Sequence, residues 1–152
     1  MTLICGIDPG LTGAVAIIDH DGLLHEVHDM PRTGSEIDTA GFVKLLDLTN
    51  LSGVVIEESQ SRPGQGHVGP YRTGRNYGVL LGALGALGWV PWRIPSSVWK
   101  PAMQLTADKA LSLEMARSLW PDTGHFDRKK DDGRAEAALL ALYAVRNLEG
   151  LA

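Results

Sequence analysis

Short apolar runs separated by turn residues make up the first part of the chain. The runs cover residues 2–7, 14–18 and 23–27, and turn signals at 8–10 and 19–22 divide them. Runs of this length, bounded by Gly, Pro and Asp, are typical of β-strands joined by tight turns. The pattern therefore predicts three antiparallel strands that follow one another along the chain.

A helical pattern and a strand pattern follow. Apolar residues three and four apart predict a helix over residues 40–48, with Thr39 as its cap. The β-branched run 54–56 predicts a fourth strand, which ends on Glu57 and Glu58.

The middle of the chain is rich in glycine, which affects both the loop and the helix that are predicted there. Residues 59–73 are rich in Gly, Pro, Ser and Arg, which predicts a long loop. Residues 75–87 are apolar on nearly all sides, which predicts a buried helix whose glycines allow a neighbour to approach closely. A fifth strand is expected over residues 89–94.

The last third of the chain is predicted to be mostly helical. We expect a helical turn over 95–99, an amphipathic helix over 107–120, a polar loop over 121–130 and a final helix over 131–148. In the amphipathic helix, Leu111, Met115 and Leu119 share one face. The order of elements predicts a single α/β domain, residues 1–152, with helices on both faces of a five-stranded mixed sheet. Its first three strands would be antiparallel and its last two parallel.

Composition supports an ordinary globular domain, and charge is unevenly distributed. The 152 residues are 44% hydrophobic and 21% charged, which excludes a disordered chain. The formal charge of −4 argues against a nucleic-acid partner when taken alone. However, ten acidic and two basic residues precede Arg62, whereas eight acidic and twelve basic residues occur from Arg62 onwards.

Cysteine usage and hydropathy indicate the compartment. The single Cys5 excludes an internal disulfide, favours a reducing environment and is expected to be a buried, inert thiol. There is no recognisable targeting segment and no apolar stretch long enough to cross a membrane. We therefore expect a cytoplasmic protein with no membrane partner.

Carboxylates occur where strands end and where the last helix begins. Asp8 and Glu57 each close an apolar strand, so they meet at one sheet edge if those strands are neighbours. Asp132 and Glu136 are four apart and project from one face of the last helix. Oxygen ligands without Cys or His suit Mg²⁺, with Mn²⁺ able to substitute. Two such ions about 4 Å apart would support phosphodiester hydrolysis.

Each of these acids also has an ordinary structural interpretation. Asp8 before Pro-Gly could simply start a turn, and Glu57 or Glu58 could be a solvated strand end. Asp131 and Asp132 could cap the last helix, and Glu136 could be a first-turn acid.

Five segments together resemble a known family. They are Gly6–Gly13 (GIDPGLTG), Val54–Glu57 (VVIE), Asn76–Gly78 (NYG), Ile94–Lys100 (IPSSVWK) and Lys130–Ala137 (KDDGRAEA). This ordered set resembles the RuvC-type Holliday-junction resolvases of the RNase H-like (retroviral-integrase) superfamily, and is most similar to the branch with phage and chloroplast resolvases. The opening loop alone is weak evidence, but the ordered set covers nearly the whole chain.

The resemblance implies an RNase H-like fold and roles for six residues. Asp8, Glu57, Asp132 and Glu136 would be the metal-binding acids, with two Mg²⁺ ions in each site. The last two acids are four apart, as in the chloroplast-like branch, whereas bacterial RuvC has them three apart; Asp131 remains an alternative to Asp132. Lys100 and Lys109 would neutralise charge near the scissile phosphate, the alternative being ordinary surface lysines.

Basic residues lie on both sides of these acids in the sequence. No acidic residue occurs from Ser59 to Ala107, and we expect Arg62, Arg72, Arg75 and Lys100 to contact DNA phosphates. Tyr71 could stack on an unpaired base or pack within the loop. Arg128, Lys129 and Lys130 form a second basic cluster, expected to bind DNA, beside Asp132.

The resemblance implies a metal-dependent endonuclease that resolves four-way DNA junctions by paired symmetric nicks. Two symmetric cuts favour a C2 homodimer without a nucleotide cofactor, and the helix over 75–87 could supply its interface. Two alternatives remain. The segment 8–13 also resembles the phosphate loop of actin-like ATPases and sugar kinases, and the basic residues would equally suit a junction-binding protein that does not cut.

Overall fold

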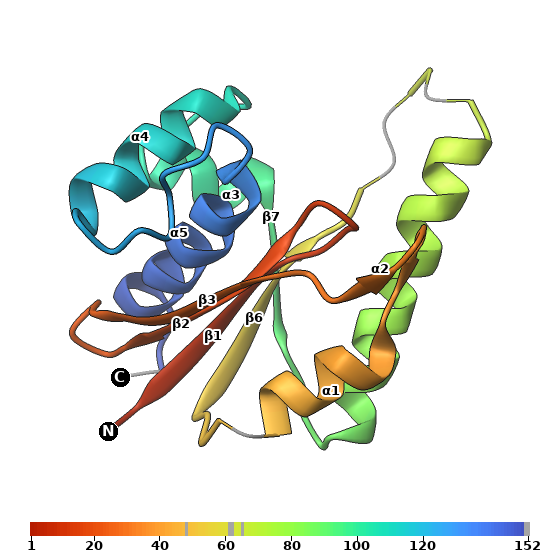
Figure 1. The fold of residues 1–152 in the computed structure, drawn as a ribbon, viewed down its shortest axis with the longest axis horizontal. Helices are drawn as coiled ribbons and strands as arrows, with labels where there is room; N and C mark the ends of the chain where they lie inside the picture. The colour runs from red at the N-terminus through yellow and green to blue at the C-terminus, as the bar shows by residue number, and fades with distance from the viewer. Residues whose placement is uncertain (48, 61–62, 65, 151–152) are drawn as a thin grey trace.

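Five strands form one mixed sheet in the computed structural model, which describes residues 1–47, 49–60, 63–64 and 66–150. The strands are β1 (Leu3–Asp8), β2 (Ala14–Asp19), β3 (Leu24–Asp29), β6 (Gly53–Glu58) and β7 (Trp92–Pro95), in the order β3-β2-β1-β6-β7 (Figure 1). β1, β2 and β3 pair antiparallel, whereas β6 and β7 join them in parallel. The predicted mixed α/β sheet is confirmed.

The register of the sheet brings two acidic residues to the same edge. Ile7 of β1 pairs in parallel with Ile56 of β6, and Asp8 and Glu57 follow these residues directly. Because neighbouring parallel strands run in one direction, both carboxylates stand at the carboxyl ends of adjacent strands.

Helices cover both faces of the sheet, as predicted. α5 (Asp132–Asn147), α3 (Ser96–Ala102) and α4 (Lys109–Leu119) lie on one side, and α1 (Thr39–Asp47) and α2 (Val68–Ala86) lie on the other (Figure 1). α5 packs directly on β1 because Gly6 carries no side chain. A Cβ at Gly6 would collide with the carbonyl oxygen of Ala137 and with Ala141.

Near α1 the structure adds one element that was not predicted and corrects one prediction. A two-stranded hairpin of β4 (Arg32–Thr33) and β5 (Glu36–Ile37), which is too short to leave a sequence pattern, precedes the helix. The predicted cap Thr39 is wrong, because Asp38 Oδ1 accepts the backbone N–H of Gly41 at 3.0 Å instead. Leu48, the predicted last residue of this helix, lies outside the described residues.

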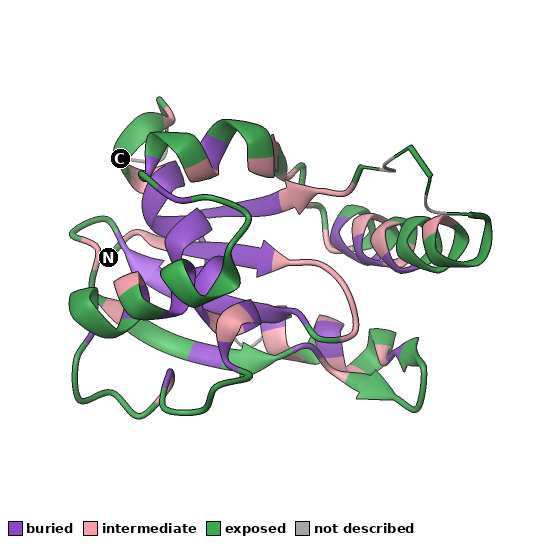
Figure 2. Cartoon of the chain, turned by 90° about the horizontal axis from the view of Figure 1, so that it is seen from above, coloured by how far each residue is buried: buried purple, intermediate pink, exposed green. Residues whose placement is uncertain are grey.

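The predicted loop over 59–73 and buried helix over 75–87 are both wrong in part. α2 already begins at Val68, because Pro70 in its first turn removes no hydrogen bond that the helix needs. Its first half is mostly exposed, as Figure 2 shows. The helix is only partly buried, since its inward side consists of Asn76, Leu80, Ala83 and Leu84. A Cβ at Gly78, Gly82 or Gly85 would meet no described atom within 4 Å, so these glycines do not serve close packing within the chain.

The helix predicted over 107–120 is confirmed as α4, but of its three predicted apolar residues only Met115 packs against the core. Leu111 and Leu119 are 39% and 40% exposed, and the residues that α4 buries are Ser112, Leu113 and Ala116. The polar hydroxyl of Ser112 is thus buried on the inward side of α4, where it contacts a carboxylate that is described below. The fifth strand is shorter than predicted, since β7 begins only at Trp92, and α5 agrees with its prediction to within a residue.

Two further findings concern Cys5 and the helices. Burial raises the pKa of the Cys5 thiol, which agrees with an inert core residue. Among the residues that the structure describes, no helix has the length and apolar character needed to cross a membrane.

Candidate active site

Three of the four predicted acids line one cavity at the carboxyl edge of the sheet. Asp8 ends β1, Glu57 lies near the end of β6, and Glu136 comes from the first turns of α5. Their carboxylates share a cavity of about 470 Å³ with Lys100 and Lys109. Residues distant in the sequence thus meet where two parallel strands end against a helix.

The cavity opposes the ionisation of its acids. Burial, followed by the charges of Glu136 and Glu57, raises the pKa of Asp8 well above its usual value, and the two lysines oppose this shift only in part. Burial also raises the pKa of Glu57, while a hydrogen bond from Trp99 acts in the opposite direction. Burial and neighbouring negative charge therefore both disfavour the ionised forms of Asp8 and Glu57 in this cavity.

Trp99 orients Glu57 from the neighbouring helix α3. Its ring is fully buried in the core, and its Nε1–H donates to Glu57 Oε2 at 2.8 Å. A core side chain anchored in this way leaves Glu57 few other positions.

Lys100 and Ser112 hold Glu136. Lys100 Nζ lies 2.6 Å from Glu136 Oε1, and the two side chains are only 12% and 6% exposed. The buried Ser112 hydroxyl donates to the same oxygen at 3.4 Å. The inward-facing serine of α4 is therefore explained by its contact with a buried carboxylate.

The fourth acid, Asp132, stands slightly apart. Its Oδ2 pairs with Lys109 Nζ at 3.0 Å, and it lines an adjoining cavity of about 380 Å³ rather than the first one. Lys109 lines both cavities, and Asp132 is the first cause of its raised pKa. Each predicted lysine thus pairs with one predicted acid of α5.

Asp131 has different partners from Asp132. It is 1% exposed and accepts the backbone N–H and Nε–H of Arg128, each at 2.8 Å. Arg134 lies 3.8 Å from the same carboxylate, and Asp29 pairs with both arginines. These contacts anchor the start of α5, so Asp131 belongs to a structural ion-pair network, whereas Asp132 lines the adjoining cavity.

The four acids fit a hard divalent cation in chemistry but are not assembled as one cluster. In the described parts of the chain, no three Asp, Glu, His or Cys side chains are arranged to hold a metal ion. Instead, Glu136 forms an ion pair with Lys100, and Asp132 forms one with Lys109. Carboxylates whose pKa values are raised by burial and by neighbouring carboxylates, as for Asp8, are those that a divalent cation would stabilise.

Comparison with known proteins supports this fold. No family model and no curated protein matches the sequence. Among solved structures, T. thermophilus RuvC in complex with Holliday junction substrate matches with a TM-score of 0.71 and 17% identity, over 96% of each chain. A Thermus thermophilus RuvC structure matches with a TM-score of 0.70 and 19% identity, over 95% of this chain and 96% of that chain. This chain has the RNase H-like fold of RuvC.

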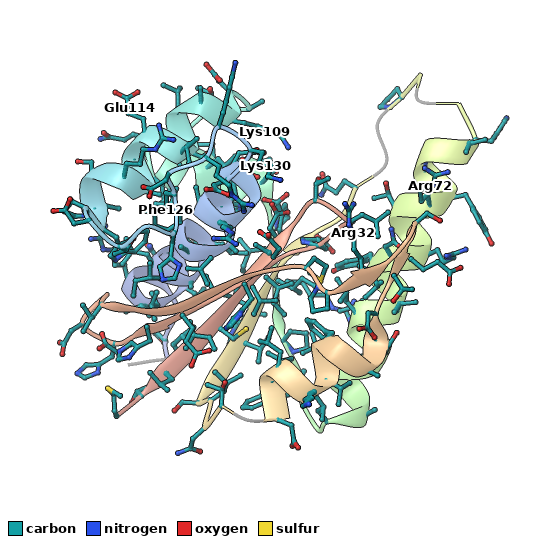
Figure 3. The ribbon with its side chains drawn as sticks, in the orientation of Figure 1. Arg32, Arg72, Lys109, Glu114, Phe126 and Lys130 are labelled. Atoms are coloured by element: carbon teal, nitrogen blue, oxygen red, sulfur yellow. The ribbon has the colours of Figure 1, made fainter. Side chains whose placement is uncertain are left out.

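On the RuvC-like fold, three predicted DNA-contacting residues lie on an exposed helix end. Tyr71, Arg72 and Arg75 belong to the exposed first half of α2, and the Tyr71 residue is 70% exposed. Figure 3 labels Arg72 on this helix. Among the described residues Tyr71 is thus mostly open to solvent, and Arg75 pairs with Glu36 at 2.7 Å. Arg62 lies outside the described residues.

The second predicted basic cluster lies beside α5 of the RuvC-like fold. Lys129 and Lys130 are exposed, and Lys130 lines the cavity that contains Asp132. Arg128 forms ion pairs with Asp131 and Asp29. Its hydrogen bonds to these two carboxylates are the main causes of its raised pKa.

Sequence reasoning assigned no role to Trp99, Ser112 or Arg32. Trp99 occurs in a quoted motif, but only the fold shows that its ring reaches Glu57. Ser112 is recognisable as a serine on an otherwise apolar helix side. Arg32 was not considered for DNA binding because it belongs to the acidic first part of the chain. It nevertheless lines the same cavity as Lys130.

Proposed function

We propose that this protein is a metal-dependent endonuclease that resolves four-way DNA junctions by paired symmetric nicks. The observation that carries the proposal is the cavity in which Asp8, Glu57 and Glu136 meet Lys100 and Lys109 at the carboxyl edge of the sheet. The fold shared with RuvC, one structure of which is a complex with Holliday junction substrate, supports the choice of substrate. The spacing of the last two acids supports the branch with phage and chloroplast resolvases.

The proposed cofactor is Mg²⁺, replaceable by Mn²⁺, with two ions in each site held by Asp8, Glu57, Asp132 and Glu136. When bound, such ions activate water and stabilise the charge of the phosphate. Trp99 keeps Glu57 oriented through its 2.8 Å hydrogen bond. Glu57, held in this way, would lose little freedom on binding a cation.

Lys100 and Lys109 would act on the phosphate itself. Both line the proposed active cavity, and each ion-pairs with one acid of α5. Once the acids are neutralised by cations, each ammonium group is available to a phosphate oxygen. The lysines would thus alternate between an acid of the protein and the DNA.

DNA would extend from this cavity over two basic surfaces. Arg72 and Arg75, with Arg62 preceding them in the sequence, would bind phosphates from the side of α2, and Lys129 and Lys130 from the side of α5. Because Arg128 is held by two aspartates, its proposed contribution is the weaker one. The exposed Tyr71 ring would stack on a base that is unpaired at the junction centre.

A homodimer would place two such sites on one junction. Two nicks related by a twofold axis need two copies of the catalytic cavity in one complex. The row of glycines on the open side of α2 supports this helix as the meeting surface, because a second backbone could approach it closely.

The proposal is tested with a synthetic four-way junction in Mg²⁺ and in EDTA, beside a linear duplex of the same sequence. We expect two symmetric nicks only in the junction with Mg²⁺, sealable by DNA ligase because they carry 5′-phosphate and 3′-hydroxyl ends. Asp8→Asn should reduce cleavage by about a hundredfold or more. Asp21→Asn, which removes a largely exposed acid remote from the cavity, is the matched control.

Other outcomes would favour the alternative functions. Binding of the junction without cleavage in Mg²⁺ or Mn²⁺ would indicate a non-cleaving junction-binding protein. ATP hydrolysis without DNA would favour the actin-like interpretation. Equal cleavage by wild type and Asp8→Asn would refute the proposed active site.

A further inference from the structure

A second cavity adjoins the proposed active site and has a basic character. Its volume is about 380 Å³, and the turn Leu11–Gly13 forms one of its sides. Arg32, Lys109, Arg128 and Lys130 line it, against the acids Asp29 and Asp132. Figure 3 shows Lys109 and Lys130 close together near the start of α5, with Arg32 towards α2.

The four basic side chains divide into two that are paired and two that are not. Lys109 pairs with Asp132, and Arg128 pairs with Asp131 and Asp29. Within the described ranges, Arg32 and Lys130 form no ion pair, and both are exposed. The cavity therefore presents two positive charges that no ion pair of the described residues neutralises.

Backbone contacts hold the walls of this cavity in place. The N–H of Met30 donates to the carbonyl oxygen of Gly13 at 3.0 Å, which ties the segment before Arg32 to the β1–β2 turn. On the other side, Gly133 lets α5 approach the same turn, because a Cβ there would collide with the carbonyl oxygen of Thr12. Arg32 and Lys130 are therefore carried on two segments that meet the same fixed turn.

The two cavities form one continuous surface. Thr12, Gly13 and Lys109 line both, so a bound chain of phosphates could pass from the carboxylates over the turn to the basic cavity. Consecutive phosphates of a nucleic-acid strand occur at short, regular intervals, about 3.4 Å of rise per nucleotide in a duplex. A strand cut at the first cavity must place nearby phosphates close to it.

We propose that the cavity between Arg32, Lys130 and the Leu11–Gly13 turn binds a second phosphate of the strand that is cut. This inference rests on the proposed nuclease function and adds Arg32 to it. Arg32 would supply a planar, doubly donating contact to the phosphate, and Lys130 a point charge. The contact would fix the register of the strand relative to the carboxylates.

The test measures junction binding by fluorescence anisotropy in EDTA over a range of salt concentrations. Arg32→Gln and Lys130→Gln are compared with wild type and with Lys44→Gln, an exposed lysine of α1 on the opposite face of the sheet. Each cavity variant should weaken binding about tenfold. It should also make the negative slope of log K against log salt less steep by about 0.9. Lys44→Gln should leave both quantities unchanged, and unchanged thermal unfolding would show that all variants are folded.

A second measurement locates the phosphate. Junctions carrying one uncharged methylphosphonate at successive positions on either side of the cut are bound to wild type and to Arg32→Gln. At one position near the cut, the neutral linkage should weaken wild-type binding but have no further effect on the variant, because the partner charge is already missing. At the other positions the two losses should multiply.

The outcomes separate this inference from the proposed function. If wild type cleaves the junction but the salt slopes of both cavity variants equal that of wild type, the second phosphate site is wrong and the nuclease proposal stands. If the methylphosphonate effect is the same in wild type and Arg32→Gln at every position, the inference is equally refuted. Failure of wild type to bind or cut the junction at all would refute both.

Discussion

The ion pair between Lys100 and Glu136 offers a quantitative test of the site, independent of any activity. The ammonium and carboxylate lie 2.6 Å apart, and the side chains are 12% and 6% exposed. Lys100→Met keeps most of the aliphatic stem and removes the charge. Glu136 would then be a buried carboxylate whose one remaining described hydrogen-bond donor is Ser112, at 3.4 Å.

The expected loss follows from this environment. Breaking a buried ion pair on one side costs about 3 to 5 kcal/mol, because the other charge stays buried without compensation. The Lys100 ammonium also lies 5.5 Å from the centroid of the Trp99 ring, and losing this contact adds about 0.5 kcal/mol. Replacing both partners, as in Lys100→Met/Glu136→Gln, should restore the free energy of unfolding to within about 1 kcal/mol of wild type.

The assay is urea unfolding at pH 7 in EDTA, with all variants analysed as a double-mutant cycle. Lys109→Met is the matched control, because Lys109 makes a similar contact with Asp132 but is 63% exposed. Its loss should be under about 1 kcal/mol, as for other exposed ion pairs. A loss for Lys100→Met that is no larger than that for Lys109→Met would refute the role assigned to burial.

Three further predictions concern other parts of the molecule. In EDTA at pH 7, Asp8→Asn should raise the free energy of unfolding by about 1 kcal/mol, because the raised pKa of Asp8 means that its ionised form destabilises the folded protein at pH values above the usual pKa of an aspartate. Mg²⁺ should raise the Tm of wild type only. A variant that is less stable than wild type in EDTA would contradict this prediction. The pKa of Asp19 is lowered, first by its hydrogen bond with His25. Its contribution of about 1 to 2 kcal/mol should be complete above pH 5 and lost as the pH falls below about 4, so wild type should lose more stability than Asp19→Asn between pH 7 and pH 3 in urea unfolding. Gly133→Ala should cost about 1 to 3 kcal/mol despite the better helix propensity of alanine, since its Cβ meets the carbonyl oxygen of Thr12; a more stable variant would contradict the close approach of α5.

Sequence patterns were sufficient for the strands of the sheet, and they placed Asp8 beside Glu57 on the condition that the two strands are neighbours. Apolar runs of strand length identify β1 and β6, and parallel pairing of neighbours then fixes where the residues after them lie. They were insufficient for α2, because Pro70 and nearby glycines are typical of loops. The first half of this helix also buries almost nothing that would leave an apolar pattern.

The adjacent acids Asp131 and Asp132 show a second limit of sequence reasoning. Both precede or begin the same helix, and their residue type is identical. Only the placement of Arg128, which reaches Asp131, and of Lys109, which reaches Asp132, separates a structural network from the cavities. Those partners lie in other segments, so no local spacing could distinguish the two carboxylates.

The outer strands of the sheet restrict how copies of this chain can associate. β7 is a short edge strand that begins after Pro91 and ends at Pro95, two residues without a backbone N–H for a further ladder. At the opposite edge, β3 exposes the charged side chains of Glu26 and Asp29. Both edges therefore disfavour strand addition, which protects the protein against β-mediated aggregation and leaves helical surfaces for any specific self-association.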